Sequence, residues 1–382
     1  MKEQLISKIK HSNVLGWLYV HLMKVFYYCL NIIIKADPKR IIFSSFSGRQ
    51  VSDSPKAIYD AIKADDRFNN YQLKWAVRDT SKYEFIPENE KVNINKLNFF
   101  IELFKSKYWV SNASIERLIP INTKKHIYIN SWHGVPLKHL GPDETNLEFS
   151  VKNWYHNVQF DLLTASGSYD LKIFKHIFPN TQNIQAVGLP RNEVLVSDMS
   201  NELEIKQELM KELQLDQNKP ILLYAPTFRE YALEMNNSKN EFFNPSFLED
   251  ISNQYNVLIR GHYFSENNII KNEVIDVSNY PNLNHLMIAS DLLITDYSSI
   301  MFDYMLLKKN IALYMYDFED YYQYRGMYFN PKDLGITTCT NITDLLQVVK
   351  KKVNTDYTKL EQYNSLQEPI QMIKQYILEE KE

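Results

Sequence analysis

Short apolar runs alternate with amphipathic segments along most of the chain after Pro38. The apolar runs are rich in Ile, Val, Leu and Tyr, which is typical of buried strands, and the segments between them repeat at helical spacing. The expected strands are 41–46, 71–77, 108–111, 126–131, 162–165, 184–187, 221–225, 257–260, 274–277, 292–295 and 311–314. The expected helices are 55–64, 97–107, 169–177, 202–213, 245–255, 282–289, 298–307, 342–351 and 369–380.

Strands that alternate with helices indicate parallel sheets, so the fold class is α/β. A charged helix at 202–213 and the polar segment 216–220 divide the pattern into two series. We therefore expect two Rossmann-like domains that face a cleft, the first over 37–200 and the second over 201–365. Residues 366–382 are expected to form a C-terminal helix.

The N-terminal segment 1–36 differs from the rest. It contains an apolar run, 14–34, and the first forty residues carry seven basic residues against two acidic ones. Lys24 lies inside the run, where a charge costs about 2.5–3.5 kcal/mol at the centre of a bilayer. The polar positions step by three and four residues, which indicates an amphipathic helix in a membrane interface. A helix packed on the protein's own core and a membrane-spanning helix are the alternatives. The polar stripe is His21, Lys24, Tyr28, Asn31 and Lys35.

Composition narrows the class of protein further. Of the 382 residues, 45% are hydrophobic and 23% charged, which excludes wholesale disorder and a polytopic membrane protein. The net charge of −3 gives no overall basic field, so no nucleic-acid partner is expected. The two cysteines, Cys29 and Cys339, lie far apart in the sequence and fit a reducing compartment.

Polar residues collect where predicted strands end, the place where parallel sheets bind ligands. In the first series, His133 and Gly134 follow strand 126–131, and Lys138 comes shortly after. A histidine beside a glycine at a strand exit is free to adopt an unusual backbone and to act in proton transfer. A purely structural histidine is the alternative.

In the second series, two strand ends carry cations. Thr227 and Arg229 follow strand 221–225, and Arg260 and His262 follow strand 257–260. Arginine and histidine together suit a phosphate or diphosphate. For Arg229 the alternative is an ordinary loop arginine.

A third strand end in this series leads into a helix. Ser298 and Ser299 stand at the start of the helix after strand 292–295, where free N–H groups and the helix dipole favour an anion. Simple helix capping by either serine is the alternative. Asp296 cannot attract a phosphate, so we expect it to fix the turn or to accept a hydrogen bond from a sugar hydroxyl.

Some motifs are missing from the sequence. It has no Walker loop, no GxGxxG and no GxSxG, which weakens kinase, dehydrogenase and hydrolase interpretations. It also has no Asp-x-Asp pair for a metal-held nucleotide, so we expect no metal and no cofactor.

The order of these motifs resembles that of the CDP-glycerol glycerophosphotransferases. The resemblance covers about residues 40–335 and rests on segments 132–138, 188–191, 224–229, 260–262, 293–299 and 324–329. It implies a GT-B fold, a CDP-alditol donor and wall teichoic acid synthesis at the cytoplasmic face of the cell membrane, as a peripheral protein. Glycerol phosphate would pass to a hydroxyl of a lipid-linked acceptor, and CMP would leave.

The resemblance also implies roles for individual residues. His133 and His262 match the two essential histidines of the family, with His133 as the expected base. Arg260, His262, Ser298 and Ser299 would hold the diphosphate. The remaining expected substrate-binding residues are Lys138, Arg191, Thr227, Arg229 and Asp296.

The length of the chain leaves no room for the extra N-terminal domain usual in the polymerases of this family. The sequence therefore looks more like a primase that adds one glycerol phosphate to an undecaprenyl-diphosphate disaccharide. A glycerol- or ribitol-phosphate polymerase, a GT-B glycosyltransferase that uses a nucleotide sugar, and a non-catalytic scaffold are the alternatives. The expected partners are CDP-glycerol, the lipid-linked acceptor and the membrane surface, with a homo-oligomer or other teichoic acid enzymes as further options.

Overall fold

The computed structural model describes residues 12–121, 124–145, 147–227, 229, 240–261, 274–351, 355–358 and 362–379. The chain forms two compact units. Unit 1 comprises Met1–His133, Leu140–Val194 and Gln362–Glu382, and unit 2 comprises Gly134–His139 and Leu195–Glu361. The C-terminal segment therefore returns to the unit in which the chain began.

Unit 1 is built on a seven-stranded parallel sheet with the order β3-β2-β1-β4-β5-β6-β7. The order reverses between β1 and β4, which makes the carboxyl ends of these two strands the topological switch point where such sheets bind ligands. The strands are β1 (Asp37–Ser44), β2 (Gln72–Val77), β3 (Lys91–Asn93), β4 (Ser106–Ser111), β5 (Ile127–Asn130), β6 (Leu162–Thr164) and β7 (Ile184–Gln185).

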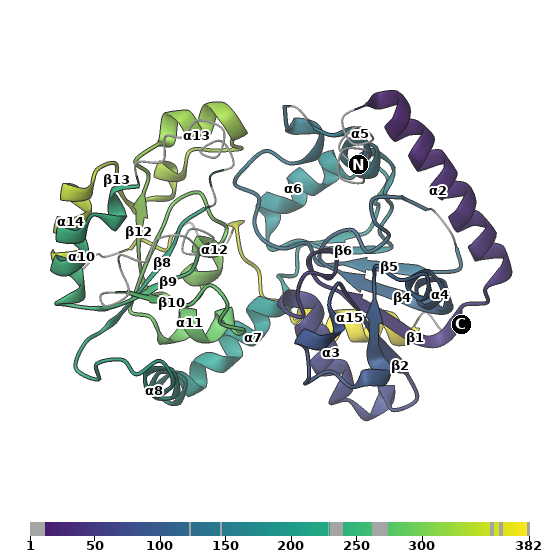
Figure 1. The fold of residues 1–382 in the computed structure, drawn as a ribbon, viewed down its shortest axis with the longest axis horizontal. Helices are drawn as coiled ribbons and strands as arrows, with labels where there is room; N and C mark the ends of the chain where they lie inside the picture. Colours follow the sequence, from purple (N-terminus) through teal and green to yellow (C-terminus); the bar gives the residue numbers. More distant parts are fainter. Residues whose placement is uncertain are drawn as a thin grey trace. The chain divides into compact units, whose positions relative to one another are not determined.

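Helices cover both faces of this sheet (Figure 1). On one face, α3 (Asp53–Lys63) and the C-terminal α15 (Pro369–Glu379) share a buried cluster with the strands. The other face is covered by α2 (Asn13–Ile33), α4 (Asn98–Lys105), α5 (Phe149–Asn157) and α6 (Ser168–Ile177). Apolar side chains on both sides of every central strand explain why these strands are continuous apolar runs in the sequence.

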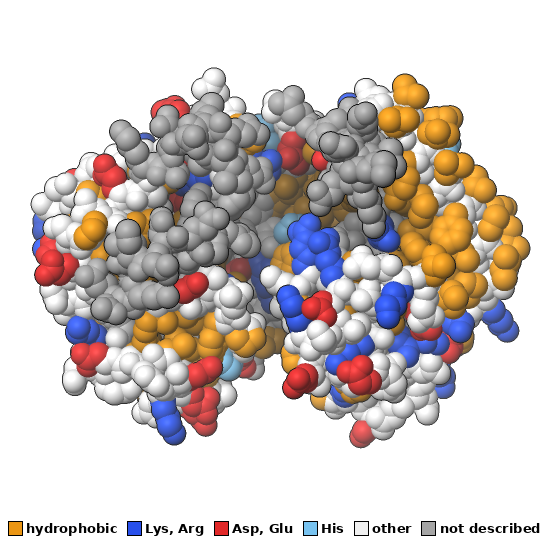
Figure 2. Space-filling view, viewed as in Figure 1, with side chains coloured by type: hydrophobic (Ala, Val, Ile, Leu, Met, Phe, Trp, Pro, Cys, Tyr) orange, Lys and Arg blue, Asp and Glu red, His pale blue; other side chains and the backbone are white. Residues whose placement is uncertain are grey.

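Helix α2 packs on unit 1 along a narrow strip only. Val20 and Tyr27 are fully buried, and Met23, Leu30 and Ile34 pack partly against the same core. Most of its other large apolar side chains are exposed, and Figure 2 shows them as a broad orange area over α2. Among the residues that the structure describes, none of the helices has the length and apolarity needed to cross a membrane.

Unit 2 has a six-stranded parallel sheet with the order β10-β9-β8-β11-β12-β13, so its switch point lies between β8 and β11. The strands are β8 (Ile221–Ala225), β9 (Asn256–Ile259), β10 (Val274–Asp276), β11 (Leu292–Thr295), β12 (Asn310–Tyr314) and β13 (Thr337–Cys339).

The helices of unit 2 pack against its sheet (Figure 1). Helices α10 (Pro245–Ser252) and α14 (Ile342–Lys351) bury Leu248, Ile251 and Leu345 against one face. The remaining helices are α8 (Glu202–Glu212), α11 (Leu283–Ala289), α12 (Ile300–Met305) and α13 (Phe318–Arg325). Helix α7 (Pro190–Asp198) carries the chain from unit 1 into unit 2.

Candidate active site

His133 follows β5 closely and lies between two residues whose backbone φ is positive. Its neighbours Trp132 and Gly134 both have positive φ, 50° and 144°. The Nδ1 atom of His133 is 2.7 Å from the backbone oxygen of Asn112. A carbonyl can only accept, so Nδ1 carries the proton and donates, and Nε2 keeps its lone pair. Burial lowers the pKa of His133, which favours the neutral ring that a base requires.

Asn112 follows β4 and forms hydrogen bonds to the segments that follow β5 and β1. Its carbonyl accepts from His133 after β5, and its side-chain Oδ1 accepts from the N–H of Phe46 after β1, at 2.7 Å. The imidazole stacks on Trp132, with ring centroids 4.4 Å apart, and meets the ring of Phe46 at 5.8 Å. The histidine is therefore fixed in position and tautomer at the switch point of unit 1.

Arg191 is held by a carboxylate in the same unit. It lies at the start of α7 and forms an ion pair with Asp53, whose side chain is also largely buried. Asp53 raises the pKa of His133 and Arg191 lowers it, both less strongly than burial does. The pair is thus close enough for its charges to act on the imidazole.

Glu116 supports the loop that carries Asn112, and sequence reasoning missed it. It is fully buried and accepts hydrogen bonds from Tyr128 Oη, at 2.9 Å, and from Trp154 Nε1. Burial raises its pKa. A single glutamate in an irregular segment gives no signal in the sequence, because its partners lie on β5 and α5.

In unit 2, Arg229 is buried rather than exposed to a ligand, with 2% of its side chain accessible. It lies 2.8 Å from Asp296 Oδ2 and donates from Nε to Asp317 Oδ2 at 2.6 Å. The rings of Tyr297 and Tyr321 lie 5.0 and 5.1 Å from its guanidinium carbon. Burial alone would lower its pKa, but the two carboxylates raise it overall. This geometry favours a positioning role over the expected donor contact.

Asp296 fixes the turn after β11, which was one of its two expected roles. Its Oδ1 accepts from the N–H of Thr227 at 2.9 Å and from its neighbour Tyr297. The carboxylate thereby joins the ends of β8 and β11 across the switch point of unit 2. Thr227 itself has a buried hydroxyl that finds no partner among the described residues.

Arg260 follows β9 and is half-buried. Its Nη1 donates to the backbone oxygens of Val277 and Tyr280, at 2.8 and 2.9 Å. Burial lowers its pKa, and none of the carboxylates in the described part of the chain forms an ion pair with it. The charge of Asp276 raises the pKa less strongly than burial lowers it. A cation that carbonyls orient and that forms no ion pair with a described carboxylate is suited to a phosphate. His262, two residues further on, lies outside the described residues.

The two serines precede helix α12. Ser298 Oγ accepts from the N–H of Ile300 at 3.4 Å, a weak capping contact, and Ser299 makes no side-chain capping bond. Both side chains are partly accessible. Both serines come shortly after β11, and they therefore lie near the switch point of the sheet of unit 2.

Lys138 belongs to unit 2, although it follows His133 by only five residues. Its segment forms a bridge with Met327, and its ammonium lies 5.7 Å from the ring of Tyr321. Tyr321 in turn stacks on Tyr297 with centroids 4.1 Å apart. Lys138 thus joins the aromatic cluster around Arg229. Within the described ranges, no three His, Cys, Asp or Glu side chains are grouped in a way that could hold a metal ion.

Two doubly wound parallel sheets, each with polar groups at its switch point, define the class of protein as a GT-B-like enzyme. Residues 26–371 match the family described as CDP-Glycerol:Poly(glycerophosphate) glycerophosphotransferase. The chain belongs to this family, and the resemblance seen in the sequence is confirmed.

Curated relatives cover most of this chain. A teichoic acid poly(glycerol phosphate) polymerase of Staphylococcus epidermidis is 33% identical over 316 residues, 77% of this chain but 42% of the relative. One of Bacillus spizizenii is 32% identical over 318 residues, 78% of this chain and 79% of the relative. A teichoic acid glycerol-phosphate transferase of Staphylococcus aureus is 29% identical over 345 residues, 85% of this chain and 87% of the relative. The chain thus spans less than half of one of these proteins.

Solved structures agree with the fold. The wall teichoic acid polymerase TagF superposes with a TM-score of 0.80 at 28% identity, covering 96% of this chain and 97% of that one. A variant of TagF soaked with CDPG matches with a TM-score of 0.78. A UDP-GlcNAc 2-epimerase from Neisseria meningitidis shares the fold alone, at 11% identity, a TM-score of 0.51, and coverage of 89% of this chain and all of that one.

Proposed function

We propose that this protein transfers glycerol phosphate from CDP-glycerol to a hydroxyl of a lipid-linked disaccharide in wall teichoic acid synthesis. The acceptor hydroxyl gives its proton to the base, and its oxygen attacks the phosphorus that bears the glycerol. The bond from that phosphorus to the CMP oxygen breaks, and CMP leaves with the electron pair. Such a reaction needs positioning and charge neutralisation more than covalent help from the enzyme.

The observation that carries this proposal is the geometry of His133. Its Nδ1 is committed to the carbonyl of Asn112, and burial keeps the ring neutral, so Nε2 is a preorganised proton acceptor. A positioned base of this kind contributes roughly 10²–10⁴-fold to a rate. His133 therefore acts as the general base, as the family resemblance implies.

Unit 2 supplies the donor site in this proposal. Arg260 brings a cation that is not paired with a described carboxylate, and Ser298 and Ser299 bring hydroxyls at the switch point. These groups neutralise the charge that builds up on departing CMP. His262 joins them by the family pattern. CDPG in a solved structure of the related TagF supports a CDP-linked donor for this chain as well.

The number of glycerol phosphates added is a separate question. Chain length pointed to a primase, yet the 318 matched residues of the B. spizizenii polymerase already make up 79% of that protein. A polymerase of this family can therefore be little longer than this chain. A primase of Bacillus subtilis is also similar, 31% identical over 253 residues. The length of the chain does not decide whether one glycerol phosphate or many are added. The mass of the product decides this question.

We also propose that α2 holds the protein at the cytoplasmic face of the membrane. Its exposed apolar side chains, among them Leu18, Leu22 and Ile32, form a face that the core of unit 1 does not cover. Such a face on a helix with basic neighbours is suited to the interfacial region of a bilayer. At that surface the protein would bind a lipid-linked acceptor.

The test is CMP release by the purified protein with a soluble acceptor analogue. We expect turnover with CDP-glycerol and none with UDP-sugars, while CDP-ribitol is run as the competing donor. His133→Asn should lower turnover by roughly 10²–10⁴-fold. His176→Asn is the matched control, because this exposed histidine pairs only with Asp143 among the described residues. UDP release from a nucleotide sugar would instead establish a glycosyltransferase, and no release with any donor would favour a scaffold.

A further inference from the structure

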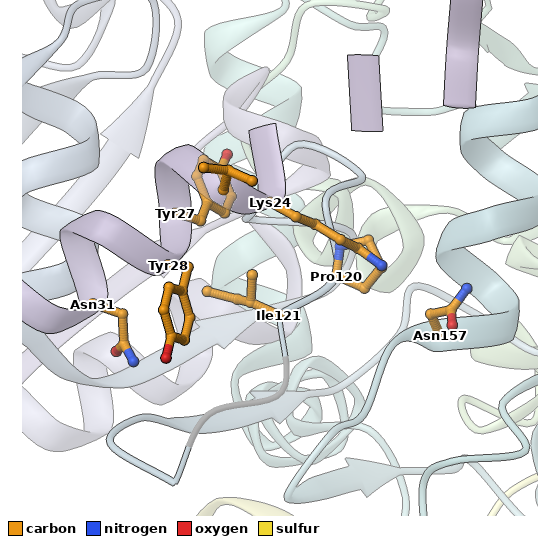
Figure 3. Close-up of a pocket in the computed structure, with 8 residues that line it drawn as sticks. Lys24, Tyr27, Tyr28, Asn31, Pro120, Ile121 and Asn157 are labelled. Atoms are coloured by element: carbon orange, nitrogen blue, oxygen red, sulfur yellow. The ribbon is translucent and has the colours of Figure 1, made fainter. Parts of the chain in front are cut away.

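A cavity of about 530 Å³ opens on unit 1 between α2 and the segment that follows β4. Figure 3 shows Lys24, Tyr27, Tyr28 and Asn31 of α2 on one side, and the loop residues 120–121 and Asn157 of α5 on the others. Its volume falls within the range of roughly 300–1,000 Å³ in which small ligands are bound. None of the residues assigned to catalysis or donor binding lines it.

The accessible lining is mainly apolar, with the amides of Asn31 and Asn157 and one cation, Lys24. Val25, Tyr28 and Ile121 contribute accessible apolar surface, whereas Tyr27 and Pro120 lie buried beneath it. Lys24 is half-buried, and its side chain runs from α2 across the cavity toward Pro120 (Figure 3). In the part of the chain that the structure describes, Lys24 has neither an ion pair nor a hydrogen bond from its ammonium group. An unpaired ammonium beside apolar surface favours a ligand with an anionic group and an apolar part.

The cavity is continuous with the exposed face of α2. Val25 and Tyr28 line the cavity, yet their side chains are 63% and 66% exposed. They therefore belong both to the rim and to the face assigned above to the membrane interface. The cavity therefore opens beside the apolar face of α2, which favours a lipid over a soluble anion.

We propose that this cavity binds one anionic phospholipid of the bilayer. Its acyl chain packs on Val25, Tyr28 and Ile121, and its phosphate pairs with the ammonium of Lys24. This inference rests on the proposed membrane contact of α2 and adds to it a defined lipid site. The lipid site adds a specific contact between unit 1 and the membrane to the general contact made by the apolar face of α2.

Vesicle binding of the full-length protein tests the inference. The vesicles contain phosphatidylcholine alone or mixed with phosphatidylglycerol, and no polyisoprenyl lipid. Lys24→Gln is compared with Lys35→Gln, which removes the same charge from an exposed position just beyond α2. A lysine near an anionic surface contributes about fivefold to binding. We expect a loss of about fivefold at most for Lys35→Gln and of about twentyfold or more for Lys24→Gln, on phosphatidylglycerol vesicles only.

A second variant fills the cavity. Ile121→Trp should weaken binding to both kinds of vesicle, because it displaces the acyl chain whatever the headgroup. Its folding is checked by circular dichroism and thermal unfolding. If it does not fold, the comparison of the two lysine variants decides the matter. Glycerol phosphate and inorganic phosphate, which lack the chain, should not compete.

Each failure has its own signature. Equal losses for Lys24→Gln and Lys35→Gln would reduce the site to ordinary surface attraction. Unchanged binding by folded Ile121→Trp would show that no chain enters the cavity, and competition by inorganic phosphate would show a free-anion site. Binding that requires added polyisoprenyl phosphate would assign the cavity to the acceptor lipid. If wild-type protein bound no vesicle, the membrane contact of α2 would itself be wrong.

Discussion

Arg229→Gln tests the role that the structure gives to this arginine. The change removes the cation between Asp296 and Asp317, two carboxylates whose side chains are 2% and 10% exposed. Removing one partner from a buried ion pair costs about 3–5 kcal/mol, because the remaining charge is left uncompensated. For a unit of about 150–250 residues, 1 kcal/mol corresponds to roughly 2–4 °C in the unfolding temperature. We therefore expect unit 2 to unfold about 6–20 °C lower.

The matched control is Arg67→Gln. Arg67 also pairs with a carboxylate, Asp65 at 2.6 Å, but its side chain is 48% exposed. Solvent screens such an exposed pair, so this variant should shift the unfolding temperature far less than Arg229→Gln does. Differential scanning calorimetry measures both variants. Isothermal titration with CDP-glycerol, performed below the unfolding transition, gives the second readout.

The two readouts separate the alternatives. If Arg229→Gln lost donor binding while its unfolding temperature stayed at the wild-type value, Arg229 would be a ligand contact and the positioning role would be wrong. Arg229 binds Asp317 in a bidentate manner, because Nε donates to Oδ2 and Nη2 donates to Oδ1. Arg229→Lys keeps the charge but loses this bidentate contact, so its unfolding temperature should lie between those of wild type and Arg229→Gln.

Three further predictions concern unit 1. His133→Ala should lower kcat by roughly 10²–10⁴-fold while calorimetry still shows CDP-glycerol binding, since the base is not a donor ligand; loss of donor binding would refute this role. Because burial lowers the pKa of His133, the acidic limb of kcat/KM, where the ring takes up a proton, should be centred below about pH 6.5, the ordinary value for histidine. An acidic limb centred above that pH would contradict the assignment. Gly188→Ala should destabilise the protein more than Gly335→Ala does in thermal unfolding: both glycines have positive φ, but only at Gly188 would a Cβ atom meet backbone, 2.0 Å from the oxygen of Ser365. Equal decreases in unfolding temperature for the two variants would show that the clash with Ser365 does not destabilise the protein.

Much of the fold could be predicted from the sequence, because buried parallel strands are continuous apolar runs. Strands β8 and β11 have the predicted bounds. Strands β3 and β13 were missed, since each has three residues and lies at a sheet edge with few apolar positions. Helix α13 was also missed, because its sequence FEDYYQYR shows no clear apolar stripe.

The candidate site was predictable only in part. Topology brings strand ends together, so the positions of His133 and Asp296 followed from the pattern. What Arg229 does depends on Asp317, which lies 88 residues further along the chain after β12. Likewise, the tautomer of His133 depends on the carbonyl of Asn112, a backbone group that no residue type reveals. Burial and partners of this kind arise from packing between elements, which spacing in one sequence does not encode.

The most direct measurement is the mass of a lipid acceptor analogue after incubation with CDP-glycerol and the purified protein. We expect a gain of one or more glycerol phosphate units with equimolar CMP, and we expect His133→Asn to form this product roughly 10²–10⁴-fold more slowly than His176→Asn does. A single unit would identify a primase and a ladder a polymerase. An acceptor of unchanged mass, or one that gains a sugar from a nucleotide sugar instead, would contradict the proposed function.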